Sequence, residues 1–167
     1  MERVIRGEEA EVDIAKDDSH FLFSVGGRLL ISRQLTGQFP NYEAVLPREN
    51  DKVLELDGEL VGAAIRRVAL LADEHSHAVQ LQLEQGRLEI LSSSSQYGEA
   101  QEVVDIAYVG PTLRVGFNYQ YLLDFFAAVG QTETVRMELK DEQSAVQFSP
   151  VDQDTCDYKY IVMPMRA

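Results

Sequence analysis

Apolar and polar residues alternate along the chain in a pattern that predicts a β-α-β-β-β unit, and this unit occurs twice. In the first copy, residues 52–57 (Lys-Val-Leu-Glu-Leu-Asp) alternate as a strand does. Residues 59–73 carry apolar side chains at helical spacing, which predicts a helix with Leu60, Ala63, Ala64, Val68 and Leu71 on its apolar face. Three more strands are predicted at 78–83, 87–91 and 100–108, with a tight turn at Gln85-Gly86.

The second copy follows the same order. Residues 112–117 predict a strand, and Asn118 is suited to cap the next helix because its side-chain oxygen can accept from the free amides of the first turn. That helix is predicted over 119–129, with an apolar face of Tyr121, Leu122, Phe125, Phe126 and Val129. Further strands are predicted at 133–139, 144–149 and 158–163. The two copies predict one α+β domain over about 51–167, with the helices together on one face and antiparallel strands behind them.

Residues 1–47 match part of a third copy. Alternation predicts strands at 10–15, 20–25 and 28–33, with turns at Asp17-Asp18 and Gly26-Gly27. The segment before them has room for at most one helical turn and no leading strand, so we interpret this copy as incomplete. Pro40 and Pro47 bracket an extended connector, because proline disfavours helix at the residue before it. We therefore expect a domain boundary near residue 50, with 1–50 forming an incomplete domain.

Charge and composition narrow the classes of function. The 167-residue chain has Lys+Arg 15 against Asp+Glu 28, for a net charge of −13. Tight binding to nucleic acid needs a basic face, so it is not expected here, although a protein that surrounds DNA without gripping it stays possible. Cys156 is the single cysteine, so no internal disulfide can form. No apolar run reaches the ~20 residues that cross a bilayer, and no signal peptide is visible, so we expect a cytoplasmic protein.

Patterns for catalysis or metal binding are weak. His75 and His77, with acidic neighbours, could hold a metal, but no further ligand stands out and a solvated loop is the favoured interpretation. Cys156 lies among aspartates, and neighbouring negative charge disfavours a reactive thiolate. The sequence contains no nucleophile-elbow motif and no phosphate-binding glycine loop. We therefore predict a non-catalytic protein that needs no cofactor or metal.

Three segments combine apolar bulk with a polar tip, as peptide-binding surfaces do. They are the connector at 39–42, the helix start Asn118–Tyr121 and the chain end at 158–167. Chain ends are usually polar and frayed, so an apolar end with flexible thioethers suggests a docked tail on a surface that accepts several ligands. The other interpretation, which composition alone favours, is that Ile161, Val162 and Met163 simply fill a core.

Three segments together resemble the bacterial sliding clamp, the β subunit of the DNA polymerase III holoenzyme. They are residues 28–47, residues 116–124 (Gly-Phe-Asn-Tyr-Gln-Tyr-Leu-Leu-Asp) and the ending Tyr-Ile-Val-Met-Pro-Met-Arg. The resemblance covers essentially the whole chain and implies a DNA-clamp fold, with antiparallel sheets outside and helices on one inner face. Clamp subunits normally contain three domains and are more than twice this length. The chain would then correspond to the latter part of the middle domain, 1–50, and the complete third domain, 51–167.

The resemblance implies a processivity factor and not an enzyme. Two subunits of this family close into a ring around duplex DNA in the bacterial cytoplasm, in association with the nucleoid. The ring tethers the catalytic subunit of the replicative DNA polymerase, the clamp loader and repair polymerases through Gln-Leu-x-Leu-Phe-like peptides. These peptides dock in a groove between the middle and third domains. The positions of this chain that match the groove are Pro40, Val45, Asn118, Tyr121, Ile161, Val162, Met163, Pro164, Met165 and Arg166.

The chain departs from the family pattern at three positions. Arginine is common at Ala44, an aromatic residue can occur at Ser76, and leucine is usual at Ala167. The far wall of the groove comes from an earlier part of the middle domain, which this sequence lacks. We therefore expect weak peptide binding.

The resemblance also implies a DNA-facing side and a subunit interface. Arg66 and Arg67, on the predicted helix 59–73, would face the DNA, although they can equally be ordinary surface residues. The interface would include Leu70, Leu71, Glu99 and Glu102, with the last two on the strand at 97–104. In the family this surface meets the first domain of a partner subunit. We expect that this chain alone does not close the usual ring, and the alternative function is a peptide-binding module that does not encircle DNA.

Overall fold

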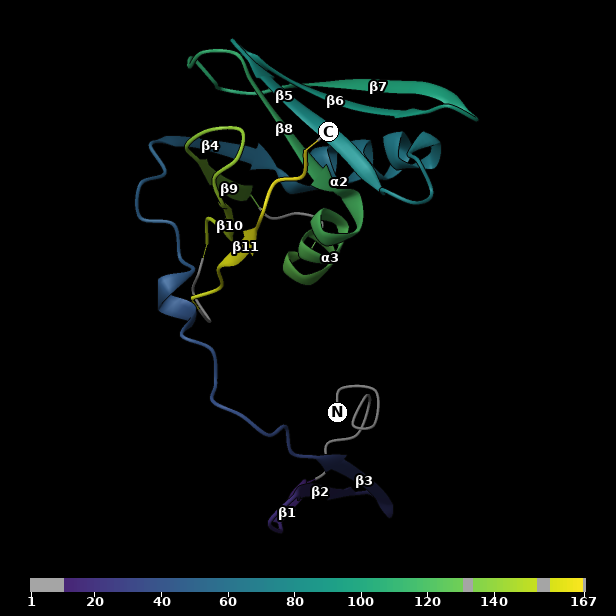
Figure 1. Ribbon diagram of the computed structural model, residues 1–167, viewed down its shortest axis with the longest axis vertical. Helices are drawn as coiled ribbons and strands as arrows, with labels where there is room; N and C mark the ends of the chain where they lie inside the picture. The colour runs from purple at the N-terminus through teal and green to yellow at the C-terminus, as the bar shows by residue number, and fades with distance from the viewer. Residues whose placement is uncertain (1–10, 131–133, 153–156, 167) are drawn as a thin grey trace. The chain divides into compact units, whose positions relative to one another are not determined.

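The computed structural model describes residues 11–130, 134–152 and 157–166. The chain forms two compact units, Met1–Asn41 and Tyr42–Ala167, and each is described by itself (Figure 1). The division falls inside the predicted connector, and the assignment of 1–50 to one domain stays a prediction. Cys156, Ala167 and the helical turn predicted before residue 10 lie outside the described residues.

The first unit contains a three-stranded antiparallel sheet in the order β1-β2-β3, formed by β1 (Asp13–Lys16), β2 (His20–Val25) and β3 (Arg28–Arg33). In the first turn, Asp17 Oδ1 accepts from the Ser19 N–H at 2.7 Å and from the His20 N–H at 2.6 Å. Gly26 and Gly27, with φ of 53° and 75°, form the second turn. The second and third predicted strands are confirmed, whereas the first begins at Asp13 and not at residue 10.

The second unit begins with the short 3-10 helix η1 (Tyr42–Ala44) and then repeats the order strand, helix, three strands. The first copy contains β4 (Lys52–Asp57), α2 (Gly58–Val68), the 3-10 helix η2 (Ala69–Leu71), β5 (Ala78–Glu84), β6 (Arg87–Ser94) and β7 (Gly98–Asp105). The second copy contains β8 (Leu113–Asn118), α3 (Tyr119–Val129), β9 (Thr134–Leu139), β10 (Val146–Pro150) and β11 (Tyr160–Val162). The predicted repeat is confirmed.

Several predicted element boundaries are wrong: β6 runs to Ser94 and not to residue 91, and β10 and β11 begin two residues later than predicted, at Val146 and Tyr160. The helix predicted to reach residue 73 ends at Val68, because the chain tightens there into η2. The strand predicted at 100–108 is β7 and ends at Asp105. Beyond that point the chain wraps around the β5–β6 turn, where the Gly86 N–H donates to Tyr108 O at 2.9 Å. The buried Tyr108 hydroxyl then donates to Pro111 O at 2.8 Å.

The two copies exchange their leading strands. One sheet has the order β11-β10-β9-β4 and the other has the order β7-β6-β5-β8. Each sheet therefore contains three strands of one copy and the first strand of the other, and every pairing is antiparallel. The strands β4 and β8 occupy equivalent edge positions in the two sheets. Each sheet is complete only when both copies are folded.

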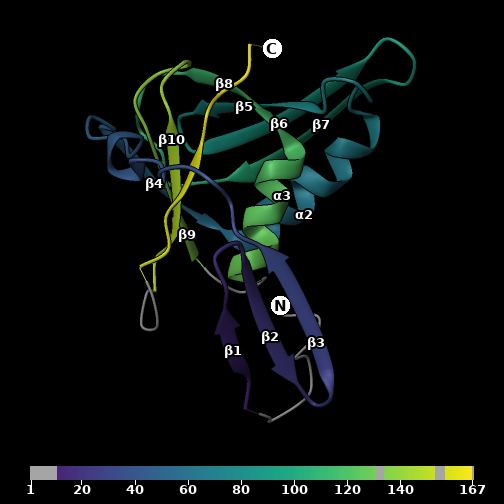
Figure 2. The ribbon, with the colours of Figure 1, turned by 60° about the horizontal axis from the view of Figure 1, so that its bottom comes forward.

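The helices α2 and α3 lie side by side and cover the inner faces of both sheets (Figure 2). On α2 the buried apolar side chains are those of Val61, Ala64, Ile65 and Val68, which follow the i, i+3, i+4, i+7 spacing of a helix face. Leu60, which we predicted on the apolar face, is 56% exposed. The helices approach closely at Gly62, where an added Cβ would stand 3.3 Å from Phe126 Cγ.

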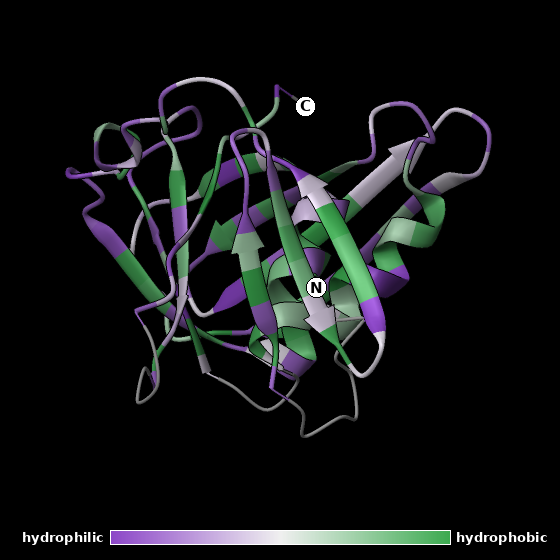
Figure 3. Ribbon diagram, turned by 90° about the horizontal axis from the view of Figure 1, so that it is seen from below, coloured by the Kyte–Doolittle hydropathy of each residue, from purple (hydrophilic) through white to green (hydrophobic). Residues whose placement is uncertain are grey.

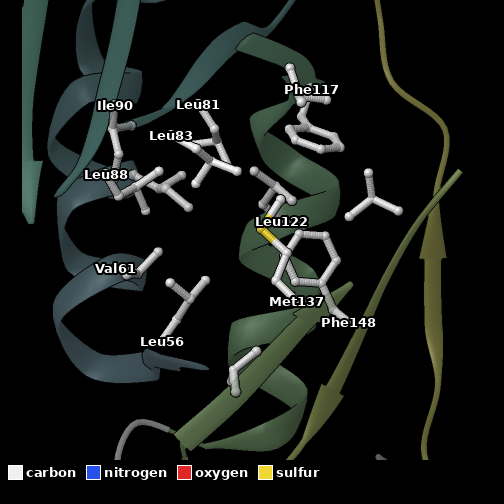
Figure 4. Packing of buried hydrophobic residues seen from close by; sticks show 14 of the residues in the cluster. Leu56, Val61, Leu81, Leu83, Leu88, Ile90, Phe117, Leu122, Met137 and Phe148 are labelled. Carbon is white, nitrogen blue, oxygen red and sulfur yellow. The ribbon is translucent and has the colours of Figure 1, made fainter. Parts of the chain in front are cut away.

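The core lies between the sheets and the helices. Hydrophobic and hydrophilic segments alternate along the strands (Figure 3), so one face of each sheet is apolar. Leu81, Leu83, Leu88 and Ile90 come from one sheet, and Met137 and Phe148 come from the other. These side chains converge with Leu122 of α3 (Figure 4). The predicted architecture, with antiparallel sheets on one side and paired helices on the other, is confirmed.

Candidate functional site

The C-terminal tail connects the two sheets of the second unit. It enters as β11 at the edge of the first sheet, where Val162 pairs with Val146 of β10. It then crosses to the edge of the second sheet, where the Met165 N–H donates to Gly116 O of β8 at 2.8 Å. In Figure 1 the tail is the yellow segment that runs from β11 toward β8. Backbone pairing therefore holds the tail at both of its ends.

The tail is divided between core and surface. Because side chains alternate along a strand, Tyr160 and Val162 share one face while Ile161 and Met163 share the other. Val162 is 4% exposed and belongs to the core, whereas Met163 is 62% exposed. The interpretation that the tail residues fill the core is therefore correct for Val162. Met163 instead presents its thioether to solvent.

An aromatic cluster anchors β11 against α3. The Phe125 ring lies 5.5 Å from Tyr160, 5.9 Å from Tyr158 and 5.5 Å from Phe148, measured between ring centroids. Phe148 in turn meets Phe117 of β8 edge to face at 6.2 Å. Such offset and edge-to-face pairs add to the free energy that comes from burying the rings. The cluster fixes the strand from which Met163 projects.

Burial raises the pKa of the Tyr160 hydroxyl, and the nearby Asp124, Tyr158 and Tyr121 raise it further. As the pH rises past the ordinary pKa of 10.0, this hydroxyl ionises in the unfolded chain before it ionises in the folded unit. Unfolding then releases a proton, so the free energy of unfolding falls as the pH rises.

We expect Tyr160→Phe to lose part of this alkaline destabilisation, because phenylalanine has no proton to release. Urea unfolding at about pH 8 and about pH 10.5 would measure it as a smaller drop in midpoint than in the parent. Phe125→Leu, which changes the same aromatic cluster without removing a titratable group, should keep the pH dependence of the parent. An unchanged drop in Tyr160→Phe would contradict the assignment.

The start of α3 lies next to this strand. Asn118 Oδ1 accepts from the Gln120 N–H at 2.9 Å, which confirms the predicted N-cap. Tyr121, one turn into the helix, is 53% exposed and lies close enough to Tyr160 to affect its pKa. The Tyr119 N–H donates to His77 O at 2.9 Å, and the two rings meet edge to face at 5.4 Å. His77 has a φ of 53°, a conformation that sequence patterns did not predict.

The two predicted groove residues of the connector, Pro40 and Val45, fall in different units. Val45 follows η1 and is 57% exposed in the second unit. Pro40 belongs to the first unit, so it is not placed relative to the tail. Its role in the groove stays a prediction.

Two hollows flank the tail, and Met165 and Arg166 line both of them. The first, of about 770 Å³, lies against β5, β6 and β7, and the second, of about 590 Å³, lies against β8 and the β9–β10 turn. Pro164 lines only the second. Tyr121, Ile161 and Met163 line neither hollow; Tyr121 and Met163 are exposed, whereas Ile161 is half-buried. The sequence did not reveal that strand residues such as Gln80 and Leu91 would line the first hollow.

The predicted DNA-facing arginines differ in their surroundings. Arg67 forms a two-pronged ion pair with Glu102 of β7, in which Nη2 lies 2.5 Å from Oε2. This pairing raises the pKa of the Arg67 guanidinium and lowers the pKa of the Glu102 carboxyl. Arg66 is exposed and lines a smaller hollow between α2 and α3. The structure therefore joins a predicted DNA-facing residue to a predicted interface residue.

The other predicted interface residues surround a free sheet edge. β7 is the end strand of its sheet, so one side of its backbone carries no strand partner among the described residues. Leu70 on η2 is 79% exposed and Leu71 is half-buried. Glu99 faces outward on β7, on the side opposite to Glu102.

The comparison with known families decides the identity. Residues 43–166 match the family model described as DNA polymerase III beta subunit, C-terminal domain. The chain belongs to the sliding clamp family. The Pseudomonas aeruginosa beta sliding clamp is 37% identical to it over 166 residues, which are 99% of this chain and 44% of that protein. The chain thus spans less than half the length of the sliding clamps it matches.

Solved sliding clamps share the fold. The crystal structure of the P. aeruginosa clamp bound to griselimycin matches 99% of this chain and 44% of its own, with a TM-score of 0.84 and 37% identity. The Caulobacter crescentus clamp matches 99% of this chain and 43% of its own, with a TM-score of 0.83 and 32% identity. Both values describe the same architecture over nearly the whole chain.

Within 11–130, 134–152 and 157–166, no group of three or more His, Cys, Asp or Glu side chains could hold a metal ion. Over the same ranges, no helix has the length and apolar character needed to cross a membrane.

Proposed function

We propose that this chain acts as the C-terminal part of a DNA polymerase processivity clamp, a non-catalytic subunit that tethers other proteins to DNA. The observation that carries the proposal is how the C-terminal tail is held and exposed. Its backbone is held to both sheets, while Met163 and Tyr121 stay 62% and 53% exposed beside it. An ordered segment that leaves a large, flexible side chain such as Met163 exposed offers a surface on which a partner can dock.

The chemistry of this surface fits a short apolar peptide. Thioethers adapt to differently shaped ligands, and Tyr121 adds a polar tip that fixes orientation. We propose that it binds Gln-Leu-x-Leu-Phe-like peptides of the replicative polymerase, the clamp loader and repair polymerases. The relative solved with griselimycin supports ligand binding by this family. Pro40, Val45, Asn118 and Ile161 are proposed to complete the site.

A peptide titration tests this function. A fluorescent Gln-Leu-x-Leu-Phe peptide should bind the 167-residue chain saturably. We expect a dissociation constant near the weak end of protein–peptide affinities, on the order of 10–100 μM, because Met163 and Tyr121 are open to solvent and not enclosed in a pocket. A scrambled peptide of the same composition is the control. Anisotropy that never saturates with the docking peptide, or equally strong binding of the scrambled one, would reject the proposal.

DNA contact is proposed to be topological and weak. The net charge of −13 opposes binding to phosphates, and the Arg67 guanidinium is already paired with the Glu102 carboxylate. Arg66 remains exposed on the helical side of the unit. A closed ring needs no strong contact, because it retains DNA by its shape.

The edge of β7, with Leu70 and Leu71, is proposed as the subunit interface. Glu99, Glu102 and Asp105 all lie on this strand, so pairing of β7 with a second copy of itself would place like charges together. We therefore expect the 167-residue chain to sediment as a monomer at about neutral pH and moderate salt. A closed dimer or larger ring at micromolar concentration would contradict this and would favour DNA encirclement by the chain itself.

A further inference from the structure

The first hollow beside the tail has a floor of strand residues that extends beyond the proposed docking surface, with which it shares only Met165 and Arg166. Register pairs place Met165, Gly116, Gln80, Leu91 and Gln101 in a single row across the outward face of the sheet. Four of these five residues line the hollow. Four strand spacings of about 4.8 Å make the row about 19 Å long, which an extended peptide of about six residues would span.

The middle of this row is apolar where the strand pattern calls for a polar residue. On β6, Arg87 and Glu89 face outward and Leu88 and Ile90 face the core, so Leu91 faces outward and is only half-buried. Its neighbour Ser92 faces inward and donates to Val68 O at 2.7 Å. Leu91 therefore offers apolar surface to the hollow and not to the core.

The two ends of the hollow carry opposite charges. Arg166 lies at the tail end and Glu99 lies on β7 at the other end. Neither side chain has a hydrogen-bond or ion-pair partner among the described residues, although the Glu99 backbone pairs with Ser93 of β6. Two other pairs of polar side chains on this face are hydrogen-bonded to each other, since Gln101 donates to Glu89 and Arg114 donates to Gln82.

We infer that this hollow binds the segment that flanks the docking peptide in a partner protein, as an extended chain with a defined order of charges. The inference rests on the proposed docking function, because the tail is the wall that the two surfaces share. An acidic residue nearest the docking motif meets Arg166, an apolar residue covers Leu91, and a basic residue farthest from the motif meets Glu99. The hollow would thus select among partners that share the same motif.

Peptides with matched flanks test the inference. The docking peptide Gln-Leu-x-Leu-Phe is extended at either end by six residues, with aspartate nearest the motif, leucine in the middle and lysine farthest away. A second set exchanges the aspartate and the lysine. At low ionic strength, the peptide with aspartate nearest the motif should bind the parent chain about three- to tenfold more tightly than the peptide with the reversed order. This difference is expected only for the extension, at one end of the motif, that can enter the hollow.

Variants assign that preference to the hollow. Glu99→Lys should reduce or reverse it, and Leu91→Ser should weaken the flanked peptide about threefold while leaving the bare motif unchanged. Asp105→Lys is the control, because it reverses an outward charge of β7 that does not line the hollow. Binding of the bare motif with no difference between flank orders, or an equal effect of Asp105→Lys, would overturn the inference alone. Failure of every peptide to bind would overturn it together with the docking function.

Discussion

Replacing Phe125 with alanine is expected to lower the free energy of unfolding of the second unit by about 3–5 kcal/mol, the usual range for a buried phenylalanine. The side chain is fully buried and contacts four aromatic rings from α3, β10 and the tail region. Its loss would leave a cavity at the place where helix, sheet and tail meet. Urea unfolding followed by circular dichroism measures the change.

Two further variants make this measurement specific. Phe125→Leu keeps most of the apolar volume and should cost clearly less than alanine. Gln120→Ala changes an exposed residue of the same helix and should stay within about 0.5 kcal/mol of the parent. A loss below about 1 kcal/mol in Phe125→Ala would mean that the aromatic cluster does not hold the tail.

The second large effect is expected in binding. The double variant Met163→Ala, Met165→Ala should weaken the Gln-Leu-x-Leu-Phe peptide at least about tenfold, because covering one methionine side chain contributes about 1.5–3 kcal/mol. Stability should change little at Met163, which is 62% exposed in the free chain. A titration of the folded double variant by fluorescence anisotropy checks the result.

Leu60→Ala is the matched control for this loss. It also removes an exposed apolar side chain, 56% exposed, but from α2 and not from the tail. Its affinity for the peptide should equal that of the parent within error. A double variant that binds within twofold of the parent would show that the tail thioethers are not part of the docking surface.

Local chemistry made much of the fold predictable. Asn118 combines a short side-chain oxygen with its position before an apolar helix, and it caps α3 as predicted. Asp57 plays the same part before α2, where its Oδ1 accepts from the Leu60 N–H at 2.9 Å. That cap was readable from the repeat, because Asp57 and Asn118 both end a leading strand. The starts of both helices are therefore predictable from sequence, because each is fixed by a hydrogen bond between residues close together in the chain.

Features set by distant contacts were not predictable in the same way. Leu60 and Val61 both fit a helical apolar pattern, and the packing of α2 against α3 and the sheets decides that Val61 is buried and Leu60 exposed. Leu71 continues the helical periodicity, yet the chain has already tightened into η2. The half-buried Leu91 looks like any strand residue until the register shows that it faces outward beside the tail. The tail itself divides between core and surface, which composition alone did not separate.

The exchange of leading strands has a consequence for how the unit folds. β4 pairs with β9, which lies in the other copy of the repeat, so β4 cannot join its sheet until β9 has formed. Contacts that accompany this pairing, such as that of Lys52 Nζ with Lys140 O, join residues 88 positions apart. Closing a loop of that length costs entropy before any pairing is gained, and a high contact order slows folding. Neither half can complete a sheet from its own strands, which makes the two copies one cooperative folding unit. The tail pairs with edges contributed by β10 and β8, so it can dock only after both sheets have formed. The proposed docking surface would then form only on a fully folded unit.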